Sequence, residues 1–313
     1  MPTPTSSKAN IIVLGAGVIG LTSAVALLEE GFRVRIIATH RAPDITSSIA
    51  AGLWYPYAVE GKAVPRLAVA TLRRYKLLAK DPDTGVRLVP CQWAVPTGDD
   101  KTFWADEDVG YSQDDNVVSA MLPVADAAVF LPWLSNRIAE LGGLIEIDPT
   151  PVADLDDLPD DLIVNCTGLG SRRLCNDHRL YPIKGTVVLV ENPGIDYCVA
   201  DDQDPALPTY IIPLSTGLVL GGTAEVGEWD LTVDEAQTND IVQRCAQLEP
   251  RVRGSRVLAS RSGLRPGRDE VRLEKESRET GKIVIHNYGH GGSGYTLAWG
   301  CAEEVVRMVK ISS

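Results

Sequence analysis

The hydrophobic positions near the start of the chain change periodicity within about 30 residues. Residues 11–14 (IIVL) are all apolar, which is typical of a strand buried on both faces. After Gly20, the sequence LTSAVALLEE is apolar at helical spacing and stops at Gly31. Residues 33–38 (RVRIIA) then predict a second strand. A strand, a glycine-rich turn, a helix and a strand in this order predict a βαβ unit.

Further along, the pattern predicts more strands and two more helices. Residues 132–143 favour a helix, and a last helix is expected from about Tyr295 to Val309. Predicted strands lie at 144–147, 162–165, 186–190, 210–212, 218–220 and 283–286. The βαβ character at both chain ends and the strand-rich middle predict an α/β fold. We expect a Rossmann-like nucleotide domain, discontinuous in sequence, interrupted by an α+β domain with a mainly antiparallel sheet.

Composition narrows the classes of partner. The chain has 313 residues and a formal net charge of −12, which would repel a nucleic-acid backbone. The start lacks the features of a secretory signal, and no apolar run reaches the roughly 18 residues of a spanning helix. The six cysteines are scattered without a CxxC pair, which favours reduced thiols. We therefore expect a cytoplasmic protein that binds neither nucleic acid nor membrane.

A glycine motif lies between the first predicted strand and helix. Gly15, Gly17 and Gly20 have the spacing GxGxxG. This spacing allows a tight turn, close approach of backbone amides to a pyrophosphate, and close packing of helix on strand. The helix N-terminus adds a favourable dipole for an anion. The motif predicts a bound dinucleotide.

The end of the second strand leaves the kind of dinucleotide open. A carboxylate usually binds the adenosine ribose there, but the sequence reads Thr39-His40-Arg41. Thr39 offers a hydroxyl group, and His40 or Arg41 offers a contact for a phosphate. FAD and NAD(P) both remain possible on this motif alone.

Six segments together resemble the D-amino acid oxidase family of flavoproteins. They are GAGVIGLTSA (15–24), AAGLWYPY (50–57), NCTG (165–168), YIIP (210–213), GLRPGR (263–268) and HNYGHGGSG (286–294). They occur in the family's order and span nearly the whole chain. The resemblance implies FAD as cofactor and hydride transfer from the Cα atom of a D-amino acid to flavin N5. The implied products are a 2-oxo acid, ammonia and, from O2, hydrogen peroxide.

The resemblance also implies a two-domain protein, and we expect a homodimer. We place an FAD-binding domain at 1–57, 140–190 and 260–313, and a substrate-binding domain at 58–139 and 191–259. His286 and His290 are four residues apart, but they lie among glycines and no third ligand is evident. No metal site is expected.

Three of the matching segments imply catalytic roles. Arg265 matches the arginine that binds the substrate carboxylate, and a planar guanidinium suits this task because it forms paired hydrogen bonds. Tyr210 matches the tyrosine that donates a further hydrogen bond to this carboxylate. Gly292 matches the position whose carbonyl accepts from the substrate amine, and Ser293 is a second candidate. Arg268 is expected to be structural. No general base is required when hydride leaves a substrate with a neutral amine.

The remaining expectations are two sets of residues. The substrate pocket is expected to contain Leu53, Tyr55, Tyr57, Tyr210, Arg265 and Ser293. The residues expected to bind FAD are Gly15, Ala16, Gly17, Val18, Ile19, Gly20, Thr39, His40, Arg41, Thr46, Ser47, Ala51, Gly52, Leu53, Gly168, Arg265, Gly289, Gly291, Gly292, Gly294, Tyr295 and Thr296, the last at flavin O2.

Two departures from the family bear on the substrate. Ala206 stands where animal members carry a lid tyrosine. Ala224, followed by Glu225, stands where D-aspartate oxidases carry an arginine for the side-chain carboxylate. We therefore expect neutral D-amino acids rather than D-aspartate. Two other classes stay open: an NAD(P)-dependent dehydrogenase, and a non-enzymatic FAD-binding redox sensor.

Overall fold

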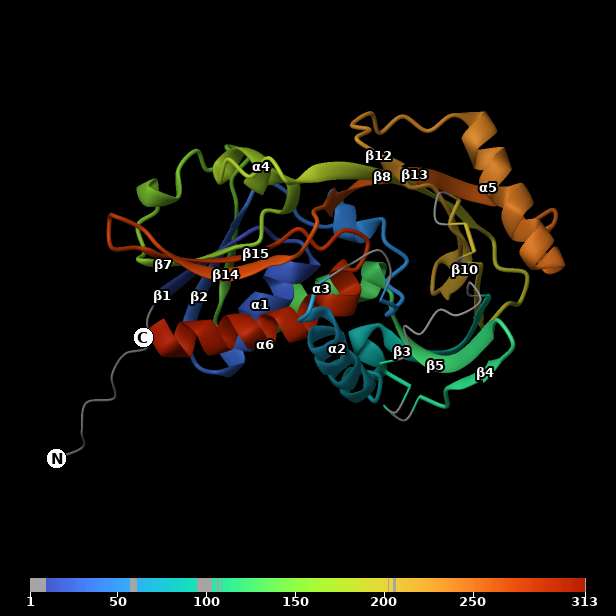
Figure 1. The fold of residues 1–313 in the computed structure, drawn as a ribbon, viewed down its shortest axis with the longest axis horizontal. Helices are drawn as coiled ribbons and strands as arrows, with labels where there is room; N and C mark the ends of the chain where they lie inside the picture. The colour runs from blue at the N-terminus through green and yellow to red at the C-terminus, as the bar shows by residue number, and fades with distance from the viewer. Residues whose placement is uncertain are drawn as a thin grey trace.

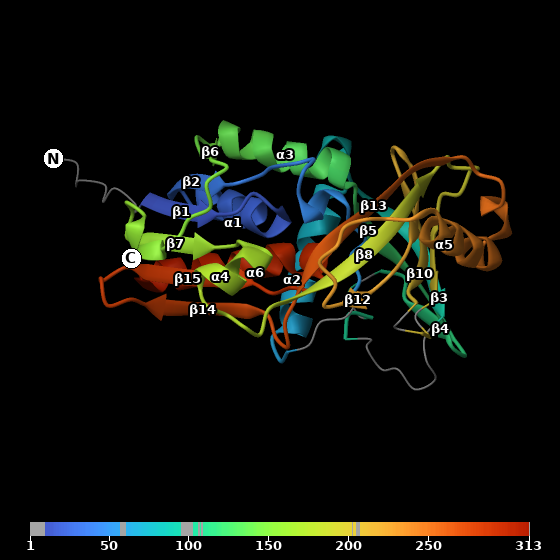
Figure 2. The same cartoon turned by 90° about the horizontal axis from the view of Figure 1, so that it is seen from above.

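Two β-sheets occupy opposite halves of the molecule. The computed structural model describes residues 10–56, 61–94, 103–105, 107, 109–201, 203–204 and 207–312. Figure 1 shows the smaller sheet, sheet A, in the half that contains the C-terminus, and the larger sheet, sheet B, in the other half. Figure 2 shows β8 (Tyr181–Val190) and β13 (Val257–Gly267) running between these halves.

Sheet A is the predicted nucleotide-binding sheet. Five of its strands are parallel, and β14 pairs antiparallel with β15 at one edge. β1 is buried from Ile11 onwards, so an all-apolar run was its sequence signal. The strands predicted at 144–147 and 162–165 are confirmed at both ends. In spatial order the strands are β14 (Arg272–Ser277), β15 (Ile283–Tyr288), β7 (Leu162–Asn165), β1 (Asn10–Leu14), β2 (Arg33–Ala38) and β6 (Leu144–Ile147).

Three long helices pack against sheet A, and a fourth, α2, packs on one of them and against strands of sheet B. The α1 helix contacts α6 and α3, and α6 also contacts α2. Small residues allow close packing, since a Cβ atom built on Gly300 of α6 would overlap the Leu67 carbonyl of α2. The helix predicted at 132–143 begins five residues earlier because the Asp126 carboxylate caps it, accepting from the Ala128 amide at 3.1 Å. These helices are α1 (Val18–Glu29), α2 (Val64–Leu78), α3 (Ala127–Glu140) and α6 (Gly294–Ser312); α4 (Ser171–Leu174) is a single turn.

Sheet B is mainly antiparallel, as predicted, and α5 (Glu235–Leu248) packs against it. β3 and β9 form a parallel pair within it. β8 and β13, which lie largely within the predicted FAD-binding segments, pair with each other in this sheet. The exact domain boundaries stay a prediction. In spatial order the strands are β12 (Glu225–Val226), β8 (Tyr181–Val190), β11 (Gly217–Gly221), β10 (Thr209–Leu214), β9 (Cys198–Asp201), β3 (Val86–Ala94), β5 (Val117–Ala125) and β4 (Ser112–Asp114), with β13 (Val257–Gly267) also on β8.

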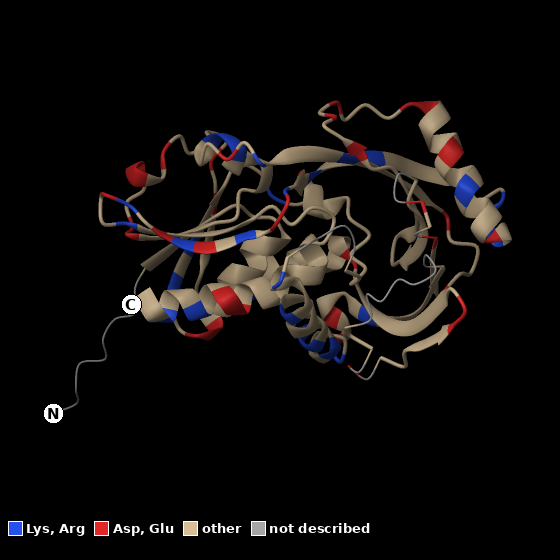
Figure 3. Cartoon of the chain, viewed as in Figure 1, with Lys and Arg blue, Asp and Glu red and all other residues tan. Residues whose placement is uncertain are grey.

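Lys and Arg lie interspersed with Asp and Glu in both halves of the molecule (Figure 3). The α2 helix is the most basic element, but its arginines Arg66, Arg73 and Arg74 form ion pairs with carboxylates. No helix in the described part of the chain combines the length and apolarity needed to cross a membrane. Among the described residues, no three His, Cys, Asp or Glu side chains gather as metal ligands.

Candidate active site

A groove of about 1040 Å³ follows the carboxyl ends of the parallel strands of sheet A. Its wall includes Gly15 after β1, Thr39 after β2, Asp148 after β6 and Thr167 after β7. This edge of an open parallel sheet is where nucleotides bind, because the loops and helix N-termini converge there. The size and position of the groove suit a dinucleotide.

The glycine motif shapes one wall of this groove as expected. Gly15 has φ +101°, and a Cβ atom there would lie 2.6 Å from the Cys166 carbonyl oxygen. A Cβ atom on Gly20 would overlap the Gly15 carbonyl, so this third glycine allows α1 to pack on the turn. Gly17 is the N-cap residue of α1 and has no side chain to occupy the groove beside the helix N-terminus. There the Val18 amide donates to Ser47 Oγ at 3.0 Å.

Two buried polar atoms beside the groove have no hydrogen-bond partner in the described part of the chain. They are Asn287 Oδ1 and His290 Nε2. Burial lowers the pKa of His290 to about 3, so its ring is neutral. Buried polar groups normally have partners, so two orphaned atoms beside one groove indicate that a polar ligand completes it. The residues present therefore fit a bound dinucleotide.

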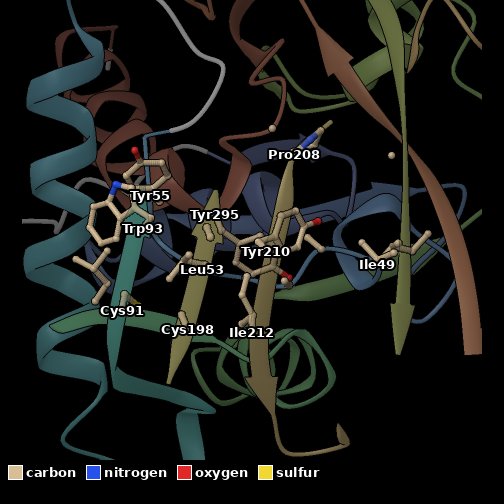
Figure 4. Close-up of a pocket in the computed structure, with 18 of the residues that line it drawn as sticks. Ile49, Leu53, Tyr55, Cys91, Trp93, Cys198, Pro208, Tyr210, Ile212 and Tyr295 are labelled. Atoms are coloured by element: carbon tan, nitrogen blue, oxygen red, sulfur yellow. The ribbon is translucent and has the colours of Figure 1, made fainter. Parts of the chain in front are cut away.

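A smaller cavity of about 170 Å³ adjoins the groove, and most of its wall comes from sheet B. In Figure 4, Trp93 and Cys91 project from β3, Cys198 from β9, and Tyr210 with Ile212 from β10. Residues 49–53, directly before Trp54, line another side of the cavity. Five residues line both spaces, so groove and cavity form one continuous site: Thr46, Ala50, Arg265, Gly292 and Tyr295.

Arg265, on β13, is the one charged side chain among the described residues that line the cavity. Its Nη1 donates to the Thr223 carbonyl at 2.9 Å, and no carboxylate of the described residues forms an ion pair with it. Gly185, on β8, makes room for it, because a Cβ atom there would lie 2.5 Å from Nη1. The guanidinium is thus held in place while its charge remains available to a ligand.

Tyr210 lies beside Arg265 in the same cavity. Its ring covers Gly221, the residue opposite it on β11, where a Cβ atom would overlap the ring. Burial raises the pKa of Tyr210, although the nearby Arg265 charge acts in the opposite direction. The phenol is therefore a protonated donor at neutral pH. Together the two side chains present an arginine fork and a hydroxyl group to one small space, as expected for a carboxylate site.

A family model described as FAD dependent oxidoreductase matches residues 10–140 and 123–308 of this chain. The chain belongs to the FAD-dependent oxidoreductase family. FAD is therefore its cofactor, and the groove has the size, position and glycine turn that FAD would need. The NAD(P) alternative left open by Thr39 is wrong.

Relatives of this flavoenzyme align with it over nearly the whole chain. It is 41% identical to the D-amino-acid oxidase of Rubrobacter xylanophilus, over 96% of this chain and 95% of the relative. It is 42% identical to the D-amino-acid oxidase of Streptomyces coelicolor, over 95% and 96%. The D-aspartate oxidase of Homo sapiens is 33% identical, over 96% and 94%.

A solved structure shows the same architecture. Glycine oxidase from Geobacillus kaustophilus superposes with a TM-score of 0.79, covering 98% of this chain and 95% of that one, at 22% identity. The predicted fold class, a Rossmann-like FAD domain with a second α+β domain, is confirmed.

Most residues expected to bind FAD line the groove, but seven do not. Ala51, Gly52 and Leu53 line the cavity instead. Gly20 serves helix packing, Arg41 is exposed, and Gly289 lies against the Arg268 side chain. The Thr296 hydroxyl donates to the Tyr55 carbonyl at 2.7 Å. Those that line the groove are Gly15, Ala16, Gly17, Val18, Ile19, Thr39, His40, Thr46, Ser47, Gly168, Arg265, Gly291, Gly292, Gly294 and Tyr295.

The substrate-pocket expectations are met unevenly. Leu53 and Tyr55 line the cavity with Tyr210 and Arg265. Ser293 is fully buried and lines neither space, and its backbone begins α6, where the Leu297 amide donates to its carbonyl at 3.0 Å. Tyr57 and the lid position Ala206 lie outside the described residues. Arg268 forms a buried ion pair with Asp177 at 3.0 Å, a structural contact as expected.

Sequence reasoning missed Arg244 on α5. Its guanidinium donates to Thr209 Oγ1 at 2.7 Å, to the Gly222 carbonyl at 3.0 Å and to Asp240 at 2.9 Å. These bonds join the start of β10 to the end of β11. They therefore hold the strand of Tyr210 beside the segment whose Thr223 carbonyl orients Arg265. An arginine on an amphipathic helix has no local sequence pattern that would indicate this role.

Proposed function

We propose that this enzyme oxidises neutral D-amino acids to 2-oxo acids, releasing ammonia and hydrogen peroxide. One observation carries the proposal. Arg265, free of any carboxylate among the described residues, faces a small apolar cavity that opens into the FAD groove. The two bacterial relatives that share over 40% of this sequence are named D-amino-acid oxidases, which supports the same substrate class.

The substrate carboxylate would bind to Arg265 and Tyr210. Nη2 and Nε of Arg265 can meet two carboxylate oxygens, while Nη1 stays on the Thr223 carbonyl. The raised pKa of Tyr210 keeps its hydroxyl a donor to the same carboxylate. Two fixed attachment points hold the Cα atom in one place, which is the positioning that hydride removal requires.

The cavity walls decide the rest of the orientation. The described lining includes no Asp, Glu, His or Lys side chain, so no residue there can act as a strong general base. We assign the Gly292 carbonyl as the acceptor for the substrate amine. Ser293 contributes only by fixing the neighbouring backbone at the start of α6. Bound FAD supplies the hydride acceptor and passes the electrons to O2. The chain's own contribution is binding, orientation and exclusion of water.

The preference for neutral substrates follows from charge. A substrate side-chain carboxylate would enter a wall of Leu53, Tyr55 and Trp93 without a second cation among the described lining residues. Burying an unpaired carboxylate costs several kcal/mol. Ala224 and Glu225 do not line the cavity, so an apolar wall, rather than repulsion by Glu225, disfavours D-aspartate.

An anaerobic flavin-reduction screen with paired D- and L-amino acids, including D-aspartate, tests this function. We expect bleaching of the flavin absorbance by neutral D-amino acids such as D-alanine or D-methionine, and little by their L-forms or by D-aspartate. Arg265→Met should raise KM by about 100-fold or more, because it removes two charge-assisted hydrogen bonds that contribute about 1.5–3 kcal/mol each. Bound flavin that no amino acid reduces would favour the redox-sensor class instead.

The proposal includes three broader points. Six free cysteines support a reducing compartment such as the cytoplasm. Light scattering would test the homodimer. We divide the chain into FAD-binding segments 1–57, 140–190 and 260–313 and substrate-binding segments 58–139 and 191–259. Sheet A supports this division, whereas β8 and β13 of the FAD-binding segments belong to sheet B. Limited proteolysis would locate the boundaries.

A further inference from the structure

Two cysteines face each other in the wall of the cavity. Cys91 on β3 and Cys198 on β9 are direct partners in the parallel register of these strands. Side chains of paired residues point to the same face of a sheet, and both thiols are buried at 2% exposure. Both line the cavity, and Figure 4 shows them on neighbouring strands below Trp93.

The spacing of the two strands suits a covalent bond between these thiols. Neighbouring strands lie about 4.8 Å apart, within the Cα separation of roughly 4.4–6.8 Å that disulfides span. The Cys91 thiol donates to the Val89 carbonyl of its own strand at 3.4 Å. Its closeness to Cys198, together with burial, raises the pKa of Cys198. Formation of a disulfide would need little movement of the backbone.

We propose that Cys91 and Cys198 form an oxidisable dithiol that hydrogen peroxide converts to a disulfide in the cavity wall. The inference rests on the proposed function for its oxidant, because peroxide would be released beside these thiols. The sulfur of one cysteine attacks the O–O bond, becomes a sulfenic acid and releases one water. The second thiol then attacks that sulfur, forming the S–S bond and releasing a second water. Two thiols are oxidised and one peroxide is reduced.

The disulfide would change the cavity wall and the sheet together. The pairing of β3 with β9 joins the β3–β5–β4 part of sheet B to β9 and β10, and β10 carries Tyr210. A covalent link at this junction fixes the Trp93 side of the cavity to the Tyr210 side. The reaction is slow because the neighbouring Cys91 and burial keep Cys198 protonated, so the bond would accumulate over many turnovers rather than in each.

Peptide mapping of the holoenzyme tests the proposal in two arms. In the first, resting enzyme is treated with excess hydrogen peroxide; in the second, it turns over D-alanine in air, with and without catalase. In the first arm we expect the free thiols to fall from six to four. We also expect the intact mass to fall by about 2 Da and a Cys91–Cys198 linked peptide that dithiothreitol removes.

The two arms separate this proposal from the proposed function. One outcome is a linked peptide with added peroxide, no linked peptide with D-alanine, and no oxygen uptake with D-alanine. This outcome supports the dithiol and refutes the oxidase function. Cys301→Ser, a buried cysteine outside the cavity wall, should still give the linked peptide, whereas Cys198→Ser should not. If wild-type enzyme treated with peroxide gives oxygen adducts, or links to other cysteines, without the Cys91–Cys198 peptide, the proposal is wrong.

Discussion

Gly185→Ala tests the placement of Arg265 without removing its charge. The added methyl group would lie 2.5 Å from Nη1 and closer still to Cζ, so the guanidinium must retreat by about 1 Å to reach ordinary contact. Hydrogen bonds of about 2.9 Å to a ligand carboxylate would then lengthen towards 4 Å and at least one would be lost. The strand itself should tolerate alanine, which is slightly favoured over glycine in a strand interior.

The loss of one charge-assisted hydrogen bond, about 1.5–3 kcal/mol, predicts 10- to 100-fold weaker binding of a carboxylate. Benzoate, chosen as a small carboxylate, can be titrated through the change in flavin absorbance, with the uncharged benzamide as matched control. Benzoate affinity should fall while benzamide affinity changes little. Unchanged benzoate affinity in a folded, flavin-loaded variant would remove Arg265 from the carboxylate site. An equal loss for both ligands would instead indicate general distortion of the cavity.

Three further predictions concern other parts of the site. Arg244→Met should raise KM roughly fivefold, about 1 kcal/mol, with a smaller change in kcat, and Arg244→Lys should recover part of it; steady-state kinetics in which only kcat falls would contradict a positioning role. Gly17→Val should keep the fold, since Gly17 has extended backbone, but weaken FAD roughly tenfold or more by filling the groove, as fluorescence titration would show. Burial lowers the pKa of His290 to about 3, below about 6.5 in the unfolded chain, so stability is lost as pH falls below about 6.5. Between pH 7 and 4.5, the free energy of unfolding of FAD-free His290→Gln, measured with urea, should therefore fall by about 2 kcal/mol less than that of the FAD-free wild type. Equal falls would show that His290 is protonated in the folded protein.

The sequence predicted sheet A better than sheet B. The strands at 144–147 and 162–165 are mostly apolar and lie between clear breakers, and their bounds were predicted without error. β3 and β5 were not predicted, because Pro90 and Pro123 interrupt their patterns and proline normally argues against a strand interior. Here each proline lies opposite a residue of the neighbouring strand, in the antiparallel pair that β3 and β5 form.

The candidate site shows the same limit. Arg265 and Tyr210 were found by resemblance to a family, since an arginine before a proline or a tyrosine in a strand has no distinctive local pattern. Arg244 and the Cys91–Cys198 pair depend on which strands become neighbours across the fold. Parallel pairing of β3 with β9 brings together residues more than 100 positions apart, and no local periodicity encodes this.

The wall shared by the groove and the cavity has a thermodynamic consequence. Arg265, Gly292 and Tyr295 belong to both spaces, so whatever orders them for one ligand orders them for the other. Binding of a carboxylate and retention of the flavin should therefore be reciprocally coupled: each must tighten the other by the same factor. The substrate would then act as a stabiliser of the holoenzyme, and an enzyme starved of amino acid would release its flavin more readily.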